Sequence, residues 1–406
     1  MWKKGVTFNP SVNMDFLLIG LVFLLVGGMI FKWTILLAFV LLLSGYFLLH
    51  SFYDRQLDKK LSMNNERKTI RLFPQDETEL PFIFANNAVF PYLNGVFRFQ
   101  SGSSITSVDY LHSKGRYIHT YEIPLTIAAK GRTKLQVPVQ AQKRGVVTLR
   151  NISFTFAHLT SFHSAELTYD AFYPLEILIY PEPRQVAGIE KLVKMNEGTA
   201  VTNMAMFENI QNRIGVRDYQ PGDPFYRINW KATAKTQELQ TNVFEKVVDR
   251  SYVFMINIAP EPSSIYGSTS SRLEDLLAYT AYLCQYAYKN NLPFSMYINA
   301  RTFSETDRNG CVKLLEGEDR VHYMQALDML ARIHTQGMVL PFEQMLMSNS
   351  SQSGRSKTIV IVGHTDNQSS DILTAWACQT GIYQVNVRDG TPVLERFLVK
   401  EAVTNG

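Results

Sequence analysis

The sequence has few cysteines and little net charge. Its 406 residues include three cysteines, Cys284, Cys311 and Cys378, which are widely spaced and odd in number. They fit neither a disulfide framework nor a zinc-binding pattern, and this usage favours a reducing compartment. The formal net charge is only +4, whereas a general nucleic-acid-binding protein carries a large basic surplus. We therefore expect no nucleic-acid partner.

Common catalytic motifs are also missing. The sequence contains no Gly-x-x-x-x-Gly-Lys-Ser/Thr, no Gly-x-Ser-x-Gly and no His-Glu-x-x-His. Two histidine pairs, His112 with His119 and His158 with His163, have no carboxylate or cysteine at a ligand-like spacing. We interpret these histidines as surface or turn residues, and we do not expect an enzyme.

Two uncharged apolar runs lie near the N-terminus, at residues 16–31 and 33–49, with Lys32 between them. Each run is near the lower limit of the roughly 17–25 residues that span a bilayer. One continuous helix would place Lys32 at mid-bilayer, which costs a few kcal/mol. We therefore predict a two-helix membrane anchor, a helical hairpin, over residues 1–52. The alternative is a cleaved signal peptide, but the first run lacks a small-residue cleavage site.

The distribution of basic residues predicts the orientation of this anchor. Lys3 and Lys4 precede the first run, and only Lys32 lies between the two runs. The second run is followed by Arg55, Lys59, Lys60, Arg67 and Lys68. We predict a multi-pass protein of the cell membrane, with the lipid bilayer as a partner and with both termini in the cytoplasm. Residues 53–68 are then a solvated juxtamembrane linker.

Residues 69–181 are predicted to form an all-β, sandwich-like domain. Short segments of alternating polarity are separated by glycine, proline, asparagine and serine, a pattern typical of a β-sandwich. The predicted strands are Thr69–Phe73, Leu80–Ala85, Val96–Phe99, Tyr117–Ile127, Thr133–Val139, Val146–Phe156 and Leu175–Tyr180. A connecting region, 182–250, follows this domain.

Residues 251–400 are predicted to form an α/β domain of the Rossmann type. Tyr252–Ile258 is a nearly continuous apolar run, as in a strand covered on both faces. Predicted helices and strands then alternate, which favours an open, mostly parallel sheet. The predicted helices are 273–287, Asp319–His334, Val339–Met347 and Asp371–Cys378, and the later strands are Pro293–Ile298, Lys357–Val362 and Tyr383–Val387. Ligands of such sheets bind beyond the carboxyl ends of the strands, here at 257–261 and 363–366.

Residues 217–235 combine a turn with basic, acidic and aromatic side chains. Pro221-Gly222 is a strong turn signal. We predict that Asp223 is the N-cap of a short helix that extends to about Lys231. The helix would carry Arg227, Trp230 and Lys231, and an amphipathic strand is expected over 238–243.

This stretch closely resembles the signature of the bacterial family catalogued as domain of unknown function fifty-eight. The matching residues are Arg217, Tyr219, Pro221, Gly222, Asp223, Arg227, Ile228, Asn229, Trp230, Ala234 and Lys235. The family more often has arginine where this chain has Lys235. The resemblance implies a membrane protein with a C-terminal domain similar to the von Willebrand factor A fold. It also implies work beside a MoxR-type AAA+ ATPase, and often beside transglutaminase-like proteins, but no settled biochemical activity.

The von Willebrand factor A resemblance raises the question of a Mg²⁺ site. That fold often binds Mg²⁺ through an Asp-x-Ser-x-Ser motif, and oxygen ligands suit this cation. Here Asn257 replaces the acid, Ala259 replaces the first serine and Glu261 the second. Thr365 and Asp366 could contribute from the neighbouring loop. We expect a structural or partner-binding edge rather than a metal site, and Mg²⁺ is the one cofactor these residues leave open.

Three functions follow from these observations. The first is a membrane-anchored adaptor whose signature residues, including Lys231, join domains or bind a protein partner such as the AAA+ ATPase. The second is binding of an anionic ligand or nucleic acid by the basic residues, with aromatic rings for stacking. The third is an enzyme of an unrecognised kind. The first agrees best with the nearly neutral charge and the missing catalytic motifs.

Overall fold

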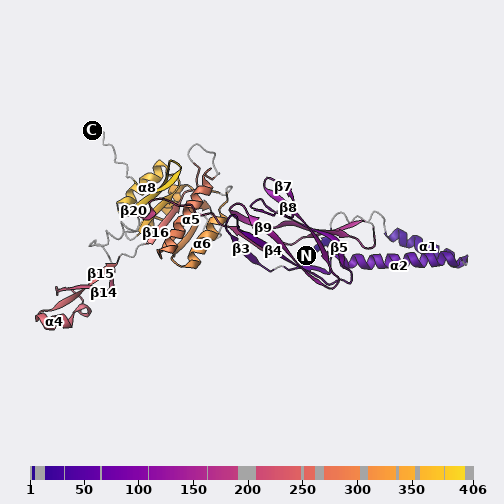
Figure 1. The fold of residues 1–406 in the computed structure, drawn as a ribbon, viewed down its shortest axis with the longest axis horizontal. Helices are drawn as coiled ribbons and strands as arrows, with labels where there is room; N and C mark the ends of the chain where they lie inside the picture. Colours follow the sequence, from indigo (N-terminus) through magenta and orange to yellow (C-terminus); the bar gives the residue numbers. More distant parts are fainter. Residues whose placement is uncertain are drawn as a thin grey trace. The chain divides into compact units, whose positions relative to one another are not determined.

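The computed structural model divides the chain into two compact units, Met1–Tyr180 and Pro181–Gly406 (Figure 1). Each unit is described by itself. The structure describes residues 2–4, 14–31, 33–64, 66–107, 109–161, 163–190, 207–247, 251–260, 269–301, 310–334, 338–352, 357–378 and 380–397.

Two apolar helices precede the β-rich region of the first unit. They are α1 (Met14–Ile30) and α2 (Thr34–Leu57), and Lys32 lies outside the described residues. Within the described part of the chain, α2 is the one helix long and apolar enough to cross a membrane, which supports membrane association. The helices approach closely at Gly28, where a Cβ atom would lie 3.1 Å from the Leu37 side chain.

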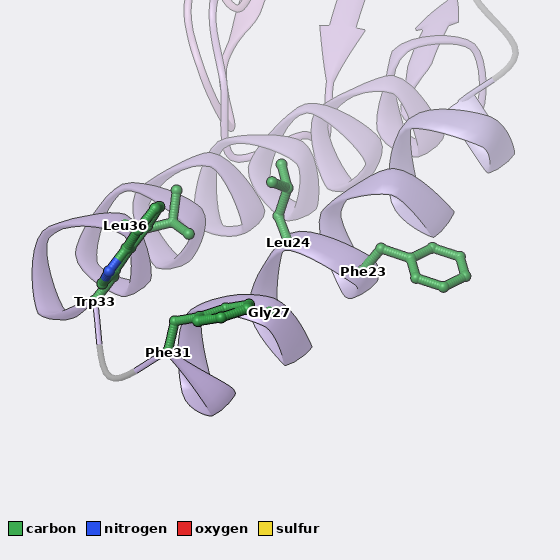
Figure 2. A pocket seen from close by; sticks show the side chains of 6 residues that line it. All are labelled: Phe23, Leu24, Gly27, Phe31, Trp33 and Leu36. Carbon is green, nitrogen blue, oxygen red and sulfur yellow. The ribbon is translucent and has the colours of Figure 1, made fainter.

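A pocket of about 300 Å³ lies where α1 meets α2, and Figure 2 shows the side chains around it. Its lining residues are Phe23, Leu24, Gly27, Phe31, Trp33 and Leu36. These side chains are almost wholly apolar. A specific ligand site needs a few polar groups that fix the orientation of the ligand. This apolar pocket is therefore not a candidate functional site.

Residues 53–68 are not a solvated linker, contrary to our expectation. Helix α2 continues to Leu57, and strand β2 (Leu61–Met63) joins a sheet. Tyr53 and Leu57 are buried in the core of the β-rich region, and the Tyr92 hydroxyl donates a hydrogen bond of 2.8 Å to the Leu57 carbonyl. Tyr53 and Leu57 are four residues apart and so share one face of the helix. The charged residues between and after them led us to predict a solvated segment.

The β-rich region contains three sheets. The six-stranded sheet has the order β1 (Trp2–Lys4), β12 (Ser164–Tyr169), β11 (Arg150–Ala157), β5 (Tyr92–Gly102), β8 (Ile118–Ile127) and β7 (Leu111–Lys114). The four-stranded sheet has the order β2, β4 (Glu77–Asn86), β9 (Arg132–Ala141) and β6 (Ile105–Thr106). The three-stranded sheet has the order β10 (Gly145–Thr148), β13 (Leu175–Ile179) and β3 (Lys68–Leu72).

An aromatic core holds the first two sheets together. Phe82 and Phe84 on β4 contact Phe97 on β5, with ring centroids 5.0 and 5.1 Å apart. All three side chains are fully buried. Alternation of buried and exposed residues along β4 and β5 places one face of each strand in this core. The predicted all-β character of this region is therefore present.

Five strands of this region were not predicted: β1, β2, β6, β7 and β12. The first four have two to four residues each, too few to show a period of two. Strand β1 pairs with β12, Trp2 opposite Tyr169, and no local pattern can announce a pairing over that distance in sequence.

The second unit contains an α/β region with one six-stranded sheet. Its order is β18 (Cys311–Gly317), β17 (Phe294–Arg301), β16 (Ser251–Ile256), β19 (Lys357–Val362), β20 (Gly381–Arg388) and β21 (Thr391–Arg396). The four central strands are parallel, and the edge strands β18 and β21 are antiparallel. The edge strands were not predicted, because half-exposed strands lack a continuous apolar run.

Helices cover both faces of this sheet. On one face α5 (Leu273–Lys289) lies over Tyr252 and Phe254, and α6 (Arg320–Arg332) contacts Phe294 through His322. On the other face α7 (Phe342–Ser348) and α8 (Asn367–Ala377) share a core with Val253 and Met255. Consecutive residues of β16 thus enter opposite cores, which explains the uninterrupted apolar sequence of this strand.

Candidate functional site

The signature residues form a β-hairpin closed by two short helices. The elements are β14 (Phe207–Asp218), the 3₁₀ helix η1 (Phe225–Arg227), α4 (Trp230–Thr236) and β15 (Gln240–Val247). The strands are antiparallel, with Asp218 opposite Gln240. Strand β14 and strand β15 lie within the predicted connecting region, 182–250, of which residues 191–206 and 248–250 lie outside the described residues.

Asp223 does not cap a helix, contrary to our prediction. Its carboxylate accepts a hydrogen bond of 2.7 Å from Arg217 Nη2 and one of 3.0 Å from the Gln220 amide. The bond from Arg217, reinforced by that amide, holds the pKa of Asp223 below its ordinary value. The helix begins later, where Asn229 accepts from the Ala232 amide at 3.1 Å. Gly222, at a φ of 110°, turns the chain immediately before Asp223.

Hydrogen bonds between polar side chains fix the closed end of the hairpin. Asn229 Nδ2 donates to Asn242 Oδ1 at 2.9 Å, and Gln240 Nε2 donates to Asp218 Oδ1 at 2.6 Å. Gln240 and Asn242 are buried on β15. Because these bonds and the Arg217–Asp223 pair satisfy the polar groups locally, the hairpin holds its shape without using its aromatic side chains.

Three aromatic side chains of the hairpin are exposed, and we call them the aromatic face: Phe225, Tyr226 and Trp230. They expose 76%, 70% and 68% of their surface. With this exposure, Trp230 is not part of a packed core. The exposed basic residues Lys231 and Lys235 lie on α4, the helix that also carries Trp230. The Arg227 guanidinium stands 5.7 Å from the Tyr226 ring centroid.

The structure places Tyr219 and Pro221 beside this face rather than in it. The Tyr219 ring lies 6.4 Å from that of Phe225, centroid to centroid, and its amide donates to the Leu239 carbonyl at 2.8 Å. Pro221 is exposed in the turn. The signature therefore has two parts: one set of residues shapes the hairpin, and another is presented to solvent.

Three of the Mg²⁺ candidates, Asn257, Thr365 and Asp366, lie at the carboxyl edge of the α/β sheet, and each has an oxygen within hydrogen-bond distance of a donor of the protein. Asn257 Oδ1 accepts from the Ala259 amide at 3.0 Å and from Asn299 Nδ2 at 2.7 Å. Asp366 caps α8 by accepting from the Ser369 amide at 2.8 Å. Thr365 Oγ1 lies 3.5 Å from the donor Gln384 Nε2. Glu261 lies outside the described residues.

A polar side chain connects two strands at this edge, at the point where the strand order reverses. Asn257 Nδ2 donates to the His364 carbonyl at 2.5 Å and so ties β16 to the loop after β19. A polar pocket of about 150 Å³ opens there, and Asn257, Gly363 and His364 contribute to its wall. It faces the position at which open α/β sheets bind ligands.

The structure assembles a histidine cluster that the sequence did not reveal. His158 lies 2.8 Å from Asp54 through Nε2, and His50 lies 3.9 Å from the same carboxylate. The two partners of His158 are more than 100 residues away in sequence, so the spacing rules that we applied to His158 and His163 could not find them. His119 instead bonds the Ile105 carbonyl at 3.0 Å, and His112 lies 3.2 Å from Glu122.

Comparison with known proteins supports the family resemblance for part of the chain. Residues 215–390 match the family model described as "Protein of unknown function DUF58". The match begins within β14, covers the rest of the signature hairpin and ends within the α/β region. No curated protein matches the sequence.

Solved structures resemble the chain only distantly. A Salmonella alpha-2-macroglobulin variant is 18% identical over 29% of this chain and 7% of that one, with a TM-score of 0.18. The seventh ScaB type I cohesin from Pseudobacteroides cellulosolvens is 11% identical over 29% and 91%, with a TM-score of 0.19. Spo0M, the sporulation control protein from Bacillus subtilis, is 12% identical over 40% and 57%, with a TM-score of 0.17. At these TM-scores the likenesses define no common fold.

Proposed function

We propose that this chain, with the DUF58 match of residues 215–390 as a starting point, is a membrane-anchored, non-enzymatic adaptor. Its signature hairpin docks a protein partner, and the family resemblance names a MoxR-type AAA+ ATPase as that partner. The observation that carries the proposal is the aromatic face, with Phe225, Tyr226 and Trp230 all more than two-thirds exposed.

Exposure of three large aromatic side chains that are close in sequence favours a docking role over a structural one. Burying aromatic surface is strongly favourable. The hairpin keeps these three rings in solvent, so this free energy remains available for binding a partner. Tryptophan, tyrosine and arginine are also the residues most enriched among the dominant contacts of protein interfaces. The neighbouring Lys231 and Lys235 favour a partner whose apolar pocket has an acidic rim.

The first unit supports a two-span anchor. Strand β1, before α1, pairs with β12 of the β-rich region, so Trp2 lies opposite Tyr169. If α1 and α2 both cross the bilayer, the chain enters and leaves on the same side, as this pairing requires. Positive charges then place both termini and both units in the cytoplasm, where an ATPase would meet the hairpin.

The sheet of the second unit supports a von Willebrand factor A-like interpretation. Strands β17, β16, β19 and β20 are parallel, and the order reverses between β16 and β19. We propose that the carboxyl edge acts as a structural joint. Asn257 Oδ1 and Asp366 Oδ1 each already accept a hydrogen bond from a backbone amide.

Anionic-ligand binding is the competing function, because basic residues accompany exposed rings. Asp218 and Asp223 reduce the local positive charge, and Arg217 is already paired with Asp223. We therefore favour the protein partner and use nucleic acid as a comparison in the test.

The experiment measures binding of the full-length protein, in lipid nanodiscs, to the purified ATPase and to a single-stranded oligonucleotide. The adaptor proposal predicts saturable binding of the ATPase that weakens roughly 30-fold in Trp230→Ala, as expected for loss of a dominant contact worth about 2 kcal/mol. Oligonucleotide binding that falls steeply with salt, without ATPase binding, would instead support the anionic-ligand function.

A further inference from the structure

We infer that His50, Asp54 and His158 form a binding site for a zinc-class divalent cation at the junction of α2 and the β-rich region. One ligand atom from each side chain lies within 4.8 Å of the others. Within the described part of the chain, this is the one group of three or more histidine, cysteine, aspartate or glutamate side chains so arranged. Two imidazoles and one carboxylate form a ligand set typical of zinc and related first-row metals.

The distances between the ligand atoms require only small adjustments around an ion. His158 Nε2 lies 2.8 Å from Asp54 Oδ1, and His50 Nε2 lies 3.9 Å from Asp54 Oδ2. Tetrahedral zinc with bonds of about 2.0–2.1 Å separates its ligand atoms by roughly 3.3 Å. The observed separations fall on both sides of that value. Rotation of side chains would therefore suffice to close the site.

Thr160 orients both imidazoles for this role. Its Oγ1 lies 2.5 Å from His50 Nδ1 and 3.3 Å from His158 Nδ1. A bound ion would displace the proton that His158 Nε2 donates to Asp54. Each imidazole would then carry its proton on Nδ1, donate it to this hydroxyl oxygen and offer its Nε2 lone pair to the ion. Histidine ligands of metals nearly always have such a second hydrogen bond, which fixes the tautomer and the ring direction.

The surroundings also favour a fixed but accessible site. The His158 side chain is 4% exposed and its ring lies against that of Tyr53, with centroids 4.8 Å apart. His50 and Asp54 are partly exposed, which leaves a path for the ion and room for water as a fourth ligand. Histidines at such a site are more selective for zinc-class metals than for Mg²⁺ or Ca²⁺, which prefer oxygen.

One cation already lies near this carboxylate. Lys4 Nζ on β1 stands 4.0 Å from Asp54 Oδ2, and its positive charge would oppose a metal ion at that distance. Removing the charge of Lys4 should therefore strengthen metal binding. If Lys4 and Asp54 form only a structural ion pair, the same change should not increase the affinity for a metal ion.

The site would fasten the membrane helix to the turn between β11 and β12. His50 and Asp54 belong to α2, whereas His158 and Thr160 belong to that turn. A bound ion would hold two segments that are distant in sequence, and metal binding that requires the folded state stabilises it. The site uses none of the residues of the aromatic face, so its failure and that of the proposed adaptor function are separable.

The test titrates Zn²⁺ into the chelator-treated full-length protein, in nanodiscs, against a chromophoric competitor. We expect one site of micromolar or tighter affinity, with a raised thermal midpoint and the visible absorption of a low-coordinate Co²⁺ complex. Asp54→Asn and His158→Ala should weaken Zn²⁺ binding at least about 100-fold, because each removes a direct ligand, and Thr160→Val should weaken it by about 10–100-fold. Lys4→Met should strengthen it by about 10-fold.

His112→Ala is the matched control, because His112 also lies beside a carboxylate, 3.2 Å from Glu122, on the same unit. It should leave Zn²⁺ affinity unchanged, and circular dichroism should show that every variant is folded. The inference is overturned if the wild type has no micromolar site. It is also overturned if folded Asp54→Asn and His158→Ala bind Zn²⁺ as the wild type does, or if Lys4→Met fails to strengthen binding.

Discussion

At the scale of single residues, the signature separates residues that bond inward from residues that face outward. Arg217 and Asp223 bond each other, and Asn229 caps α4. Trp230, one position later, is exposed. The sequence identified this set by resemblance but assigned the capping role to Asp223, because Asp-Pro after a turn is a common helix start. Asn229, the observed N-cap, is as common a capping residue as aspartate. The sequence did not show that Asp223 is instead bonded to Arg217.

The Arg217–Asp223 pair should make the stability of the protein depend on pH. Asp223 has a lowered pKa in the folded protein because Arg217 bonds its carboxylate. A lowered folded pKa contributes stability above the ordinary value of about 3.9, and this contribution is lost as the pH falls through the folded value. Arg217→Gln should raise the pKa of Asp223 toward its ordinary value, measured by the ¹³C carboxyl resonance of labelled aspartate.

Lys3→Gln is the control for that measurement. Lys3 forms an ion pair with Asp170 and lowers the pKa of that carboxyl. The change should therefore raise the pKa of Asp170 and leave that of Asp223 unaltered. An Asp223 resonance that titrates identically in the wild type and in Arg217→Gln would show that the pair does not form in solution.

At the scale of elements, fully buried elements were predicted from the sequence more accurately than partly exposed ones. Strand β19 was predicted with its observed ends, Lys357–Val362, since a strand covered on both faces is apolar throughout. Helix α6 was predicted nearly as well, because Asp319 supplies a clear N-cap. The edge strand β18 and the three-residue β1 were missed. Their partners, rather than their own composition, make them strands.

The joint between β16 and the loop after β19 depends on one glycine. Gly363 has a φ of 116°, and an added Cβ atom would overlap the Asn257 carbonyl oxygen. Gly363→Ala should destabilise the protein by at least about 3 kcal/mol, from left-handed backbone strain and overlap together. Gly390→Ala, at a φ of 77° with open space around it, should cost only the strain, about 1–2 kcal/mol. Denaturant unfolding of both variants gives the comparison, and equal losses would contradict the proposed overlap.

At the scale of the whole molecule, an apolar N-terminal segment, a β-rich region, a signature hairpin and an α/β region follow each other along the chain. The order of the apolar segment, the β-rich region and the α/β region was predicted from composition and periodicity. The signature was identified by resemblance, and its strand β14 was not predicted. The sequence could not supply the contacts that join distant segments, such as β1 with β12 or His50 with His158. Those contacts arise from tertiary packing, which no local pattern encodes.

The native cysteines offer a test of orientation. Cys378 is exposed, whereas Cys284 and Cys311 are buried, and burial also raises the pKa of the Cys284 thiol. A membrane-impermeant maleimide should therefore modify one cysteine per chain in inverted vesicles and none in sealed spheroplasts, if the second unit is cytoplasmic.

Two variants complete that measurement. Cys378→Ser should abolish the labelling in inverted vesicles. Trp33→Cys in the same background should react in spheroplasts, because a two-span anchor brings the segment between α1 and α2 to the opposite side. Labelling of Cys378 from outside the cell, or of Trp33→Cys only from inside, would contradict the proposed topology.

The most direct test of partner docking by the aromatic face compares alanine substitutions of two exposed aromatic residues, Trp230 and Tyr117, in the binding assay. Tyr117 in the β-rich region is 74% exposed and has Arg116 5.8 Å from its ring, much as Arg227 stands beside Tyr226. The ratio of the dissociation constant for the ATPase in Trp230→Ala to that in the wild type should be roughly 30, and the same ratio for Tyr117→Ala should be close to one. Equal ratios for the two variants, or no measurable binding by the wild type, would contradict the claim.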